Sequence, residues 1–143
     1  MKKGIIVLFS EDERKINKNQ FINLFNQKDI KICFVNNGSK DNTLHILKSV
    51  KEDIETNSIS ILDIKKNTST IAAVNAGVRY LYSSGDLNCI MYFKSNMLTY
   101  FKDKKKQFEI LNKIEKKFEN PLFDIKTRRN NKNVYSYKDL LNL

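Results

Sequence analysis

The sequence predicts an α/β fold of the Rossmann-like kind, with a mostly parallel sheet and helices on its faces. Two patterns predict this fold. Four short apolar runs look like buried strands, and segments with apolar residues at every third or fourth position separate them. Two parallel strands need a crossover of a dozen or more residues between them, usually a helix. Strands that alternate with helices are therefore expected to pair in parallel. A chain of 143 residues is expected to form one domain.

The first strand is predicted from Ile5 to Phe9, a continuous apolar run typical of a strand covered on both faces. A helix is predicted across residues 14–27, where one face carries Ile16, Phe21, Leu24 and Phe25. The second strand is predicted from Ile30 to Val35. Ser39 or Asp41 can cap the next helix, whose inward positions are Leu44, Leu47, Val50 and Ile54.

A third strand is predicted from Ile59 to Ile64, a third helix from Thr70 to Ser83, and a fourth strand from Cys89 to Phe93. The inward residues of that helix are Ala73, Val74, Val78 and Leu81. Because Cys33 and Cys89 fall inside predicted strands, both are expected to act as small hydrophobic residues of a reduced, cytoplasmic protein.

The regular pattern changes after Phe93. A long amphipathic helix is predicted to end at Asn120-Pro121, and its apolar stripe is expected to pack on the sheet. That stripe consists of Phe101, Phe108, Leu111, Ile114 and Phe118. Residues 126–133 are predicted to form an exposed loop, and Ser136 can cap a short terminal helix.

The net charge is +10, and lysine supplies most of it. Residues 94–143 hold 13 basic and 6 acidic side chains, a net +7. A positive field there can meet a nucleic acid, an anionic membrane or a phosphorylated ligand. A solvated lysine-rich surface explains the same charge. The scarcity of arginine, whose planar fork suits phosphate, favours this second interpretation.

A polar segment joins the second strand to the following helix. It reads Val35-Asn36-Asn37-Gly38-Ser39-Lys40-Asp41-Asn42-Thr43. An ordinary strand–turn–helix connection would account for it. It also resembles the Val-Asp-Asp-Gly-Ser-x-Asp-x-Thr signature of family 2 glycosyltransferases, which have the GT-A nucleotide-sugar-binding fold. In that family a carboxylate here accepts a hydrogen bond from the nucleotide base. The amides of Asn36 and Asn37 keep an acceptor oxygen, so the resemblance implies weakened base recognition.

A second segment, from Asn67 to Gly77, is similar to the family pattern Asn-x-Gly-x-x-x-Ala-Arg-Asn-x-Gly. Its matching residues are Asn67, Ala73, Asn75 and Gly77, whereas Ser69 and Val74 depart from the pattern. The small residues Ala73 and Gly77 are predicted to let this helix lie close to the sheet. Asn75 is predicted to be buried and to hold neighbouring backbone groups.

A third segment, Lys94-Ser95-Asn96, stands where the family has its Asp-x-Asp metal motif, after Gly85-Asp86 and an apolar strand. A divalent cation needs anionic oxygen ligands, which Lys94 and Asn96 do not provide. The resemblance therefore implies that the divalent metal cofactor is lost. Lys94 could instead contact a phosphate directly, or could face solvent at a strand end.

The resemblance covers about residues 4–96. It implies a single GT-A-like domain over residues 1–143, with a nucleotide-sugar-binding-like half at 1–96 and a short basic helical part at 97–143. No carboxylate after Asn96 has a spacing that identifies a general base, so no catalytic residue is assigned. The candidate nucleotide-binding residues are Asn36, Asn37, Gly38, Ser39, Asn67, Asn75, Lys94 and Asn96.

Three functions are compatible with these residues. The favoured one is a glycosyltransferase family 2-like protein without metal-dependent transfer, which retains nucleotide or nucleotide-sugar binding or acts as an interaction module with a protein partner. The first alternative is a small metal-independent glycosyltransferase that uses Lys94. The second is a basic nucleic-acid or membrane-surface binder that uses Arg128 and Arg129 with Tyr135 and Tyr137.

Overall fold

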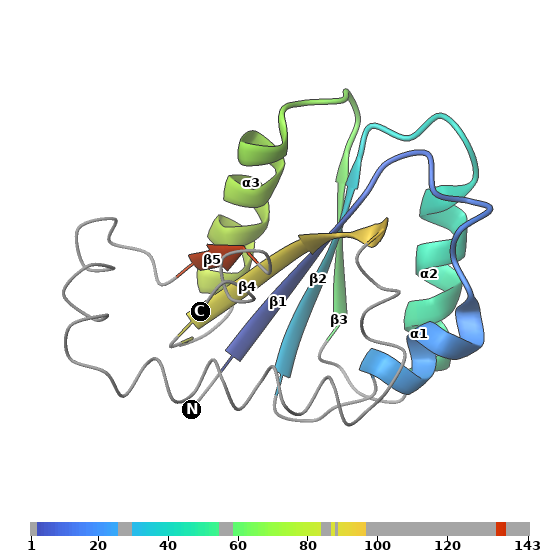
Figure 1. The fold of residues 1–143 in the computed structure, drawn as a ribbon, viewed down its shortest axis with the longest axis horizontal. Helices are drawn as coiled ribbons and strands as arrows, with labels where there is room; N and C mark the ends of the chain where they lie inside the picture. Colours follow the sequence, from blue (N-terminus) through green and yellow to red (C-terminus); the bar gives the residue numbers. More distant parts are fainter. Residues whose placement is uncertain are drawn as a thin grey trace, which may run out of the picture.

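The fold is a parallel sheet with helices on both faces (Figure 1). We describe it from a computed structural model, in which residues 3–25, 30–54, 59–83, 87, 89–96 and 134–136 are described. The strands are β1 (Lys3–Phe9), β2 (Ile30–Asn37), β3 (Ile59–Ile64), β4 (Cys89–Lys94) and β5 (Val134–Ser136). The helices are α1 (Lys18–Phe25), α2 (Thr43–Asp53) and α3 (Thr70–Ser83). The strand order is β3-β2-β1-β4-β5, and every pair is parallel.

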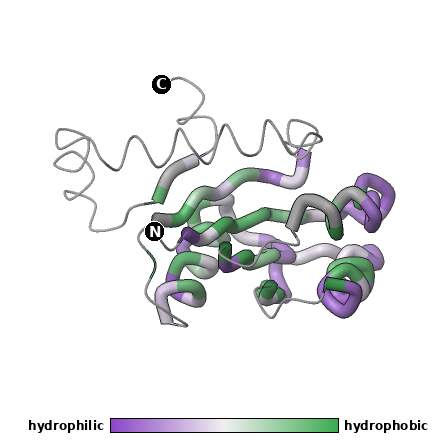
Figure 2. Tube along the Cα trace, turned by 90° about the horizontal axis from the view of Figure 1, so that it is seen from below, coloured by the Kyte–Doolittle hydropathy of each residue, from purple (hydrophilic) through white to green (hydrophobic). Residues whose placement is uncertain are grey.

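Each face of the sheet has its own hydrophobic core. Alternate residues of β1 and β2 point to opposite faces, as the two-residue period of a strand requires. Helix α3 covers one face, where Ala73, Val78 and Leu81 pack with Ile6 and Cys33. Helices α1 and α2 cover the other (Figure 1), where the rings of Phe9, Phe21 and Phe34 meet. Figure 2 shows the hydrophobic strands in the middle of these layers.

Most predicted elements within the described residues are confirmed. β3 and α3 have the predicted bounds, while β2 continues two residues further, to Asn37. The first helix begins at Lys18 and not at residue 14, because residues 13–15 form a turn. β5 was not predicted. The amphipathic helix, the 126–133 loop and the terminal helix after Ser136 lie outside the described residues.

Helix α3 lies as close to the sheet as its small residues predict. A side chain on Gly77 would place its Cβ 2.9 Å from the Cδ1 atom of Ile6 and 3.2 Å from a methyl group of Val35. The prediction for Asn75 is wrong, because its side chain is exposed on α3. Within the described part of the chain, no helix is long and apolar enough to cross a membrane.

Candidate functional site

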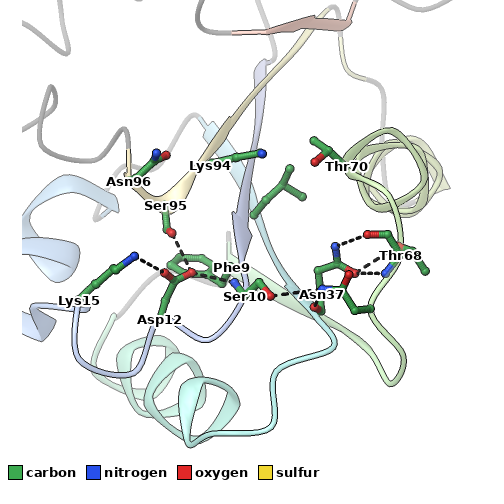
Figure 3. Close-up of a pocket in the computed structure, with 12 residues that line it drawn as sticks. Phe9, Ser10, Asp12, Lys15, Asn37, Thr68, Thr70, Lys94, Ser95 and Asn96 are labelled. Atoms are coloured by element: carbon green, nitrogen blue, oxygen red, sulfur yellow. Dashed lines mark hydrogen bonds and ion pairs between the residues drawn. The ribbon is translucent and has the colours of Figure 1, made fainter.

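The candidate site is a cavity of about 320 Å³ at the carboxyl ends of β1, β2 and β4 (Figure 3). The chain runs from β1 outward to β2 and β3, then returns to place β4 on the other side of β1. Open α/β sheets bind ligands where the strand order reverses in this way. The cavity is lined by Leu8, Phe9, Ser10, Asp12, Lys15, Asn37, Asn67, Thr68, Thr70, Lys94, Ser95 and Asn96.

The three polar segments of the sequence meet at this cavity, as their positions after strands predict. Asn37 ends β2 and Lys94 ends β4, on either side of β1, and Asn67 comes from the loop before α3. Asn96 also lines the cavity. Four predicted site residues are not part of the lining: Asn36, Gly38, Ser39 and Asn75.

Gly38 brings the first two segments into contact. Its backbone has a φ of 67°, which side-chain-bearing residues rarely adopt. A Cβ atom there would lie 2.2 Å from the backbone nitrogen of Asn67, so only glycine fits. The Gly38 N–H also donates to the carbonyl oxygen of Ile64 at 2.8 Å. This hydrogen bond and the close approach of the two backbones hold the turn after β2 against the loop after β3.

The side chain of Asn37 is bound to the backbone of Thr68 in both directions. Its Nδ2 donates to the Thr68 carbonyl oxygen at 2.9 Å, and its Oδ1 accepts the Thr68 N–H at 2.9 Å. The hydroxyl of Thr68 donates to the same Oδ1 at 3.2 Å (Figure 3). An amide can fill both roles at once, whereas an ionised carboxylate can only accept.

Asn36 lies on the opposite side of β2 and is 2% exposed. Its Nδ2 donates to Asp63 Oδ1 at 3.0 Å, and its Oδ1 accepts the hydroxyl of Ser39. The ammonium of Lys65, 2.6 Å from Asp63, keeps the pKa of that carboxyl below its usual value, and the bond from Asn36 adds to this effect. Asn36 therefore joins β2 to β3 and does not face the cavity.

Asp12 is a buried carboxylate in the cavity lining, 4% exposed, that the sequence did not single out. Its Oδ2 accepts the Ser10 N–H at 2.7 Å and the Ser95 hydroxyl at 2.8 Å. Lys15 lies 3.9 Å from its Oδ1 (Figure 3). Asp12 thus links the ends of β1 and β4. Its place directly after a buried strand is the signal that could have revealed it.

The loop after β1 is also fastened to the start of α2. The Asp12 N–H donates to the Thr43 hydroxyl at 2.9 Å, and the Glu13 N–H donates to Asp41 at 3.2 Å. Asp41 also accepts the N–H of Thr43, the first residue of α2, at 3.0 Å, but the N-cap position belongs to Asn42 and has no side-chain capping bond, so the prediction that Ser39 or Asp41 is the N-cap is wrong. Burial opposes ionisation of Asp41, but these hydrogen bonds hold its pKa below the usual value.

Lys94 supplies an exposed ammonium group at the cavity. In Figure 3 its side chain extends in the direction of Thr70, the first residue of α3. Among the described residues, no carboxylate lies within ion-pair distance of its Nζ, whereas Lys15 is paired with Asp12. Within this part of the chain, the ammonium of Lys94 therefore has no carboxylate beside it.

The chain belongs to glycosyl transferase family 2, since the family profile matches residues 15–93. Over 101 residues it is 34% identical to dolichyl-phosphate beta-glucosyltransferase of Dictyostelium discoideum, an alignment that covers 68% of this chain and 30% of that relative. It thus spans less than a third of the relative's length.

Two crystal structures of S. aureus TarS show the same fold. One, of residues 1–349, has a TM-score of 0.53 at 14% identity and covers 80% of this chain and 33% of that one. The other has a TM-score of 0.50 at 16% identity and covers 66% of this chain and 16% of that one. These likenesses confirm the predicted GT-A fold.

Proposed function

We propose that this chain binds a nucleoside diphosphate or a nucleoside diphosphate sugar in the cavity without a divalent cation, and that it does not perform metal-dependent glycosyl transfer. Lys94 is the observation that carries the proposal. It ends β4, lines the cavity and has no carboxylate partner among the described residues, and the sequence around it resembles the approach to the family's metal motif.

An ammonium at this position provides the charge that a diphosphate requires. Lysine binds phosphate as a point charge with three donors. The N-terminus of α3 borders the same cavity at Thr70, and the helix dipole favours an anion there. The rest of the lining offers mainly hydroxyl and amide groups, which suit the hydroxyls and ring polar atoms of a nucleoside.

The residues at the end of β4 do not suit a divalent cation. Lys94 has no acceptor and repels a cation, and the Ser95 hydroxyl donates to Asp12. Among the described residues, Asp12 is the only carboxylate that lines the cavity, and it already accepts two hydrogen bonds. Within the described residues, no three His, Cys, Asp or Glu side chains come together as metal ligands. A hard cation such as Mg²⁺ or Mn²⁺ prefers several anionic oxygens.

A thermal-shift screen in chelator tests the proposal. Nucleosides, nucleoside diphosphates and their sugar esters are compared, because a ligand that binds only the folded state raises its stability. At a concentration of one hundred times Kd, the melting temperature should rise by about 5–10 °C. Diphosphates should stabilise the protein more than the corresponding nucleosides do. If no nucleotide changes the melting temperature, the binding proposal is wrong and the role of an interaction module is favoured.

A further inference from the structure

The two amides that replace the family's carboxylates already have partners within the protein. Asn37 is bound in both directions to the backbone of Thr68, and Asn36 is bound to Asp63 and Ser39. Both side chains are buried, at 9% and 2% exposed. These hydrogen bonds use one N–H and the oxygen of each amide and fix its orientation, so neither amide can turn toward a base edge without breaking them.

The segment from Asn67 to Thr70 gains its position from Asn37 and not from regular secondary structure. It lies between β3 and α3, and its first three residues belong to neither element. Asn37 binds Thr68 through its side chain, while the Asn67 Nδ2 donates to the Asn37 carbonyl oxygen at 2.9 Å. These bonds join positions about thirty residues apart in the sequence. They hold Asn67, Thr68 and Thr70 against the cavity.

We propose that Asn37 is a positioning residue, which fastens the segment Asn67–Thr70 to the end of β2, and that this segment presents the cavity wall to the ligand. The ligand-binding part of this inference rests on the proposed function. An amide at position 37, in place of the family's carboxylate, is then needed to hold the cavity wall. Its side chain must donate to the Thr68 carbonyl oxygen while it accepts the Thr68 N–H, and a carboxylate can only accept.

An aspartate at position 37 would break half of this pairing. One carboxylate oxygen could still accept the Thr68 N–H, but the other would face the Thr68 carbonyl oxygen at the place where Nδ2 now donates at 2.9 Å. Two acceptors that face each other in a part-buried position repel, and neither finds a donor in the other. The loss should loosen the wall and also lower the stability of the fold.

NMR hydrogen exchange and ligand titration test the inference on the wild-type protein. Without ligand, the Asn37 side-chain amide and the Thr68 backbone amide should exchange slowly. When uridine diphosphate or guanosine diphosphate is added in chelator, the backbone amides of residues 67–70 should shift, whereas the Asn37 side-chain amide should keep its position. A large shift of that side-chain amide would show that Asn37 reads the ligand and would overturn the inference.

The variant N37D gives an independent test, with N19D as the matched control. N19D makes the same chemical change at an exposed position of α1. N37D should lower the melting temperature by several degrees, remove the slow exchange of Thr68 and weaken diphosphate binding at least several-fold. N19D should leave all three unchanged. If N37D is as stable as the wild type and binds nucleotide more tightly, position 37 is a ligand-reading site and the inference is wrong.

These results separate the two proposals. If no nucleotide shifts any resonance of the wild-type protein, the proposed function fails. The slow exchange of Thr68 and the stability of N37D still decide whether Asn37 fastens the segment.

Discussion

At the scale of the residue, the proposal depends on the position and charge of Lys94. Lys94 of β4 pairs with Leu8 of β1, and this register of the sheet fixes its place at the cavity. Its charge is not cancelled by any carboxylate in the described part of the chain. The positive charge is thus built into the protein and does not depend on a bound ion.

Replacement of Lys94 by methionine tests that role. K94M removes the ammonium and keeps the apolar stem, so it should weaken diphosphate binding about 10- to 100-fold, the loss expected for one charged hydrogen bond. Nucleoside binding should hardly change. K51M, on the exposed surface of α2, is the control and should behave as wild type. Equal Kd values for K94M and the wild type would remove Lys94 from the site.

A second prediction at the scale of the residue concerns the thiol of Cys33. It is fully buried, and burial raises the pKa of its thiol to about 12. Because the thiolate is the reactive form, iodoacetamide at pH 8 should label Cys33 only through global unfolding. Mass spectrometry of the peptides separates Cys33 from Cys89. Labelling of Cys33 at the rate of a free cysteine would contradict its place in the core.

At the scale of the element, a prediction concerns the contact between the loop after β2 and the loop after β3. Replacement of Gly38 by alanine forces a side chain into a positive φ and against the backbone of Asn67, so G38A should cost at least about 2 kcal/mol of unfolding free energy. G77A should cost less, because its closest contact is the flexible end of Ile6 and alanine favours a helix by about 1 kcal/mol. Urea unfolding of both variants checks the order; the reverse order would contradict it.

Local sequence predicted the elements where one pattern decides the structure. The apolar run from Ile59 to Ile64 and the helical spacing from Thr70 to Ser83 match β3 and α3 residue for residue. β5 has only three residues and pairs with a distant strand, so no local pattern predicts it. Residues 13–15 carry charges that suit a helix, but their bonds to Asp41 and Asp12 hold them in a turn.

The position of the candidate site was predicted from the sequence, but its hydrogen bonds were not. The rule that ligands bind at the carboxyl ends of parallel strands was sufficient to bring Asn37, Asn67 and Lys94 together. The pairings of Asn36 with Asp63 and of Asn37 with Thr68 depend on strand register and join residues 27 and 31 positions apart. They could not be predicted without the sheet. The same is true of the bond between Asp12 and Ser95, which are 83 positions apart.

At the scale of the whole molecule, the strand order makes the cavity, and the proposed ligand class rests on the family to which the chain belongs. The parallel sheet puts all carboxyl ends on one edge, and the reversal between β1 and β4 opens the site there. Arg128 and Arg129 lie outside the described residues, so the expected solvated lysine-rich surface and its alternative, binding of nucleic acid or anionic lipid, both stay untested.

The central claim is that nucleotide binding in this cavity does not depend on a metal ion, and isothermal titration calorimetry tests it most directly. The dissociation constant of the nucleoside diphosphate that gives the largest thermal shift is measured in EDTA and again with excess Mn²⁺ or Mg²⁺. Because Lys94 is proposed to supply the positive charge that a diphosphate requires, the two Kd values should agree within about twofold, a difference of less than about 0.5 kcal/mol. A Kd that falls tenfold or more on addition of metal would show that carboxylates such as Asp12 form a working cation site, and would contradict the account.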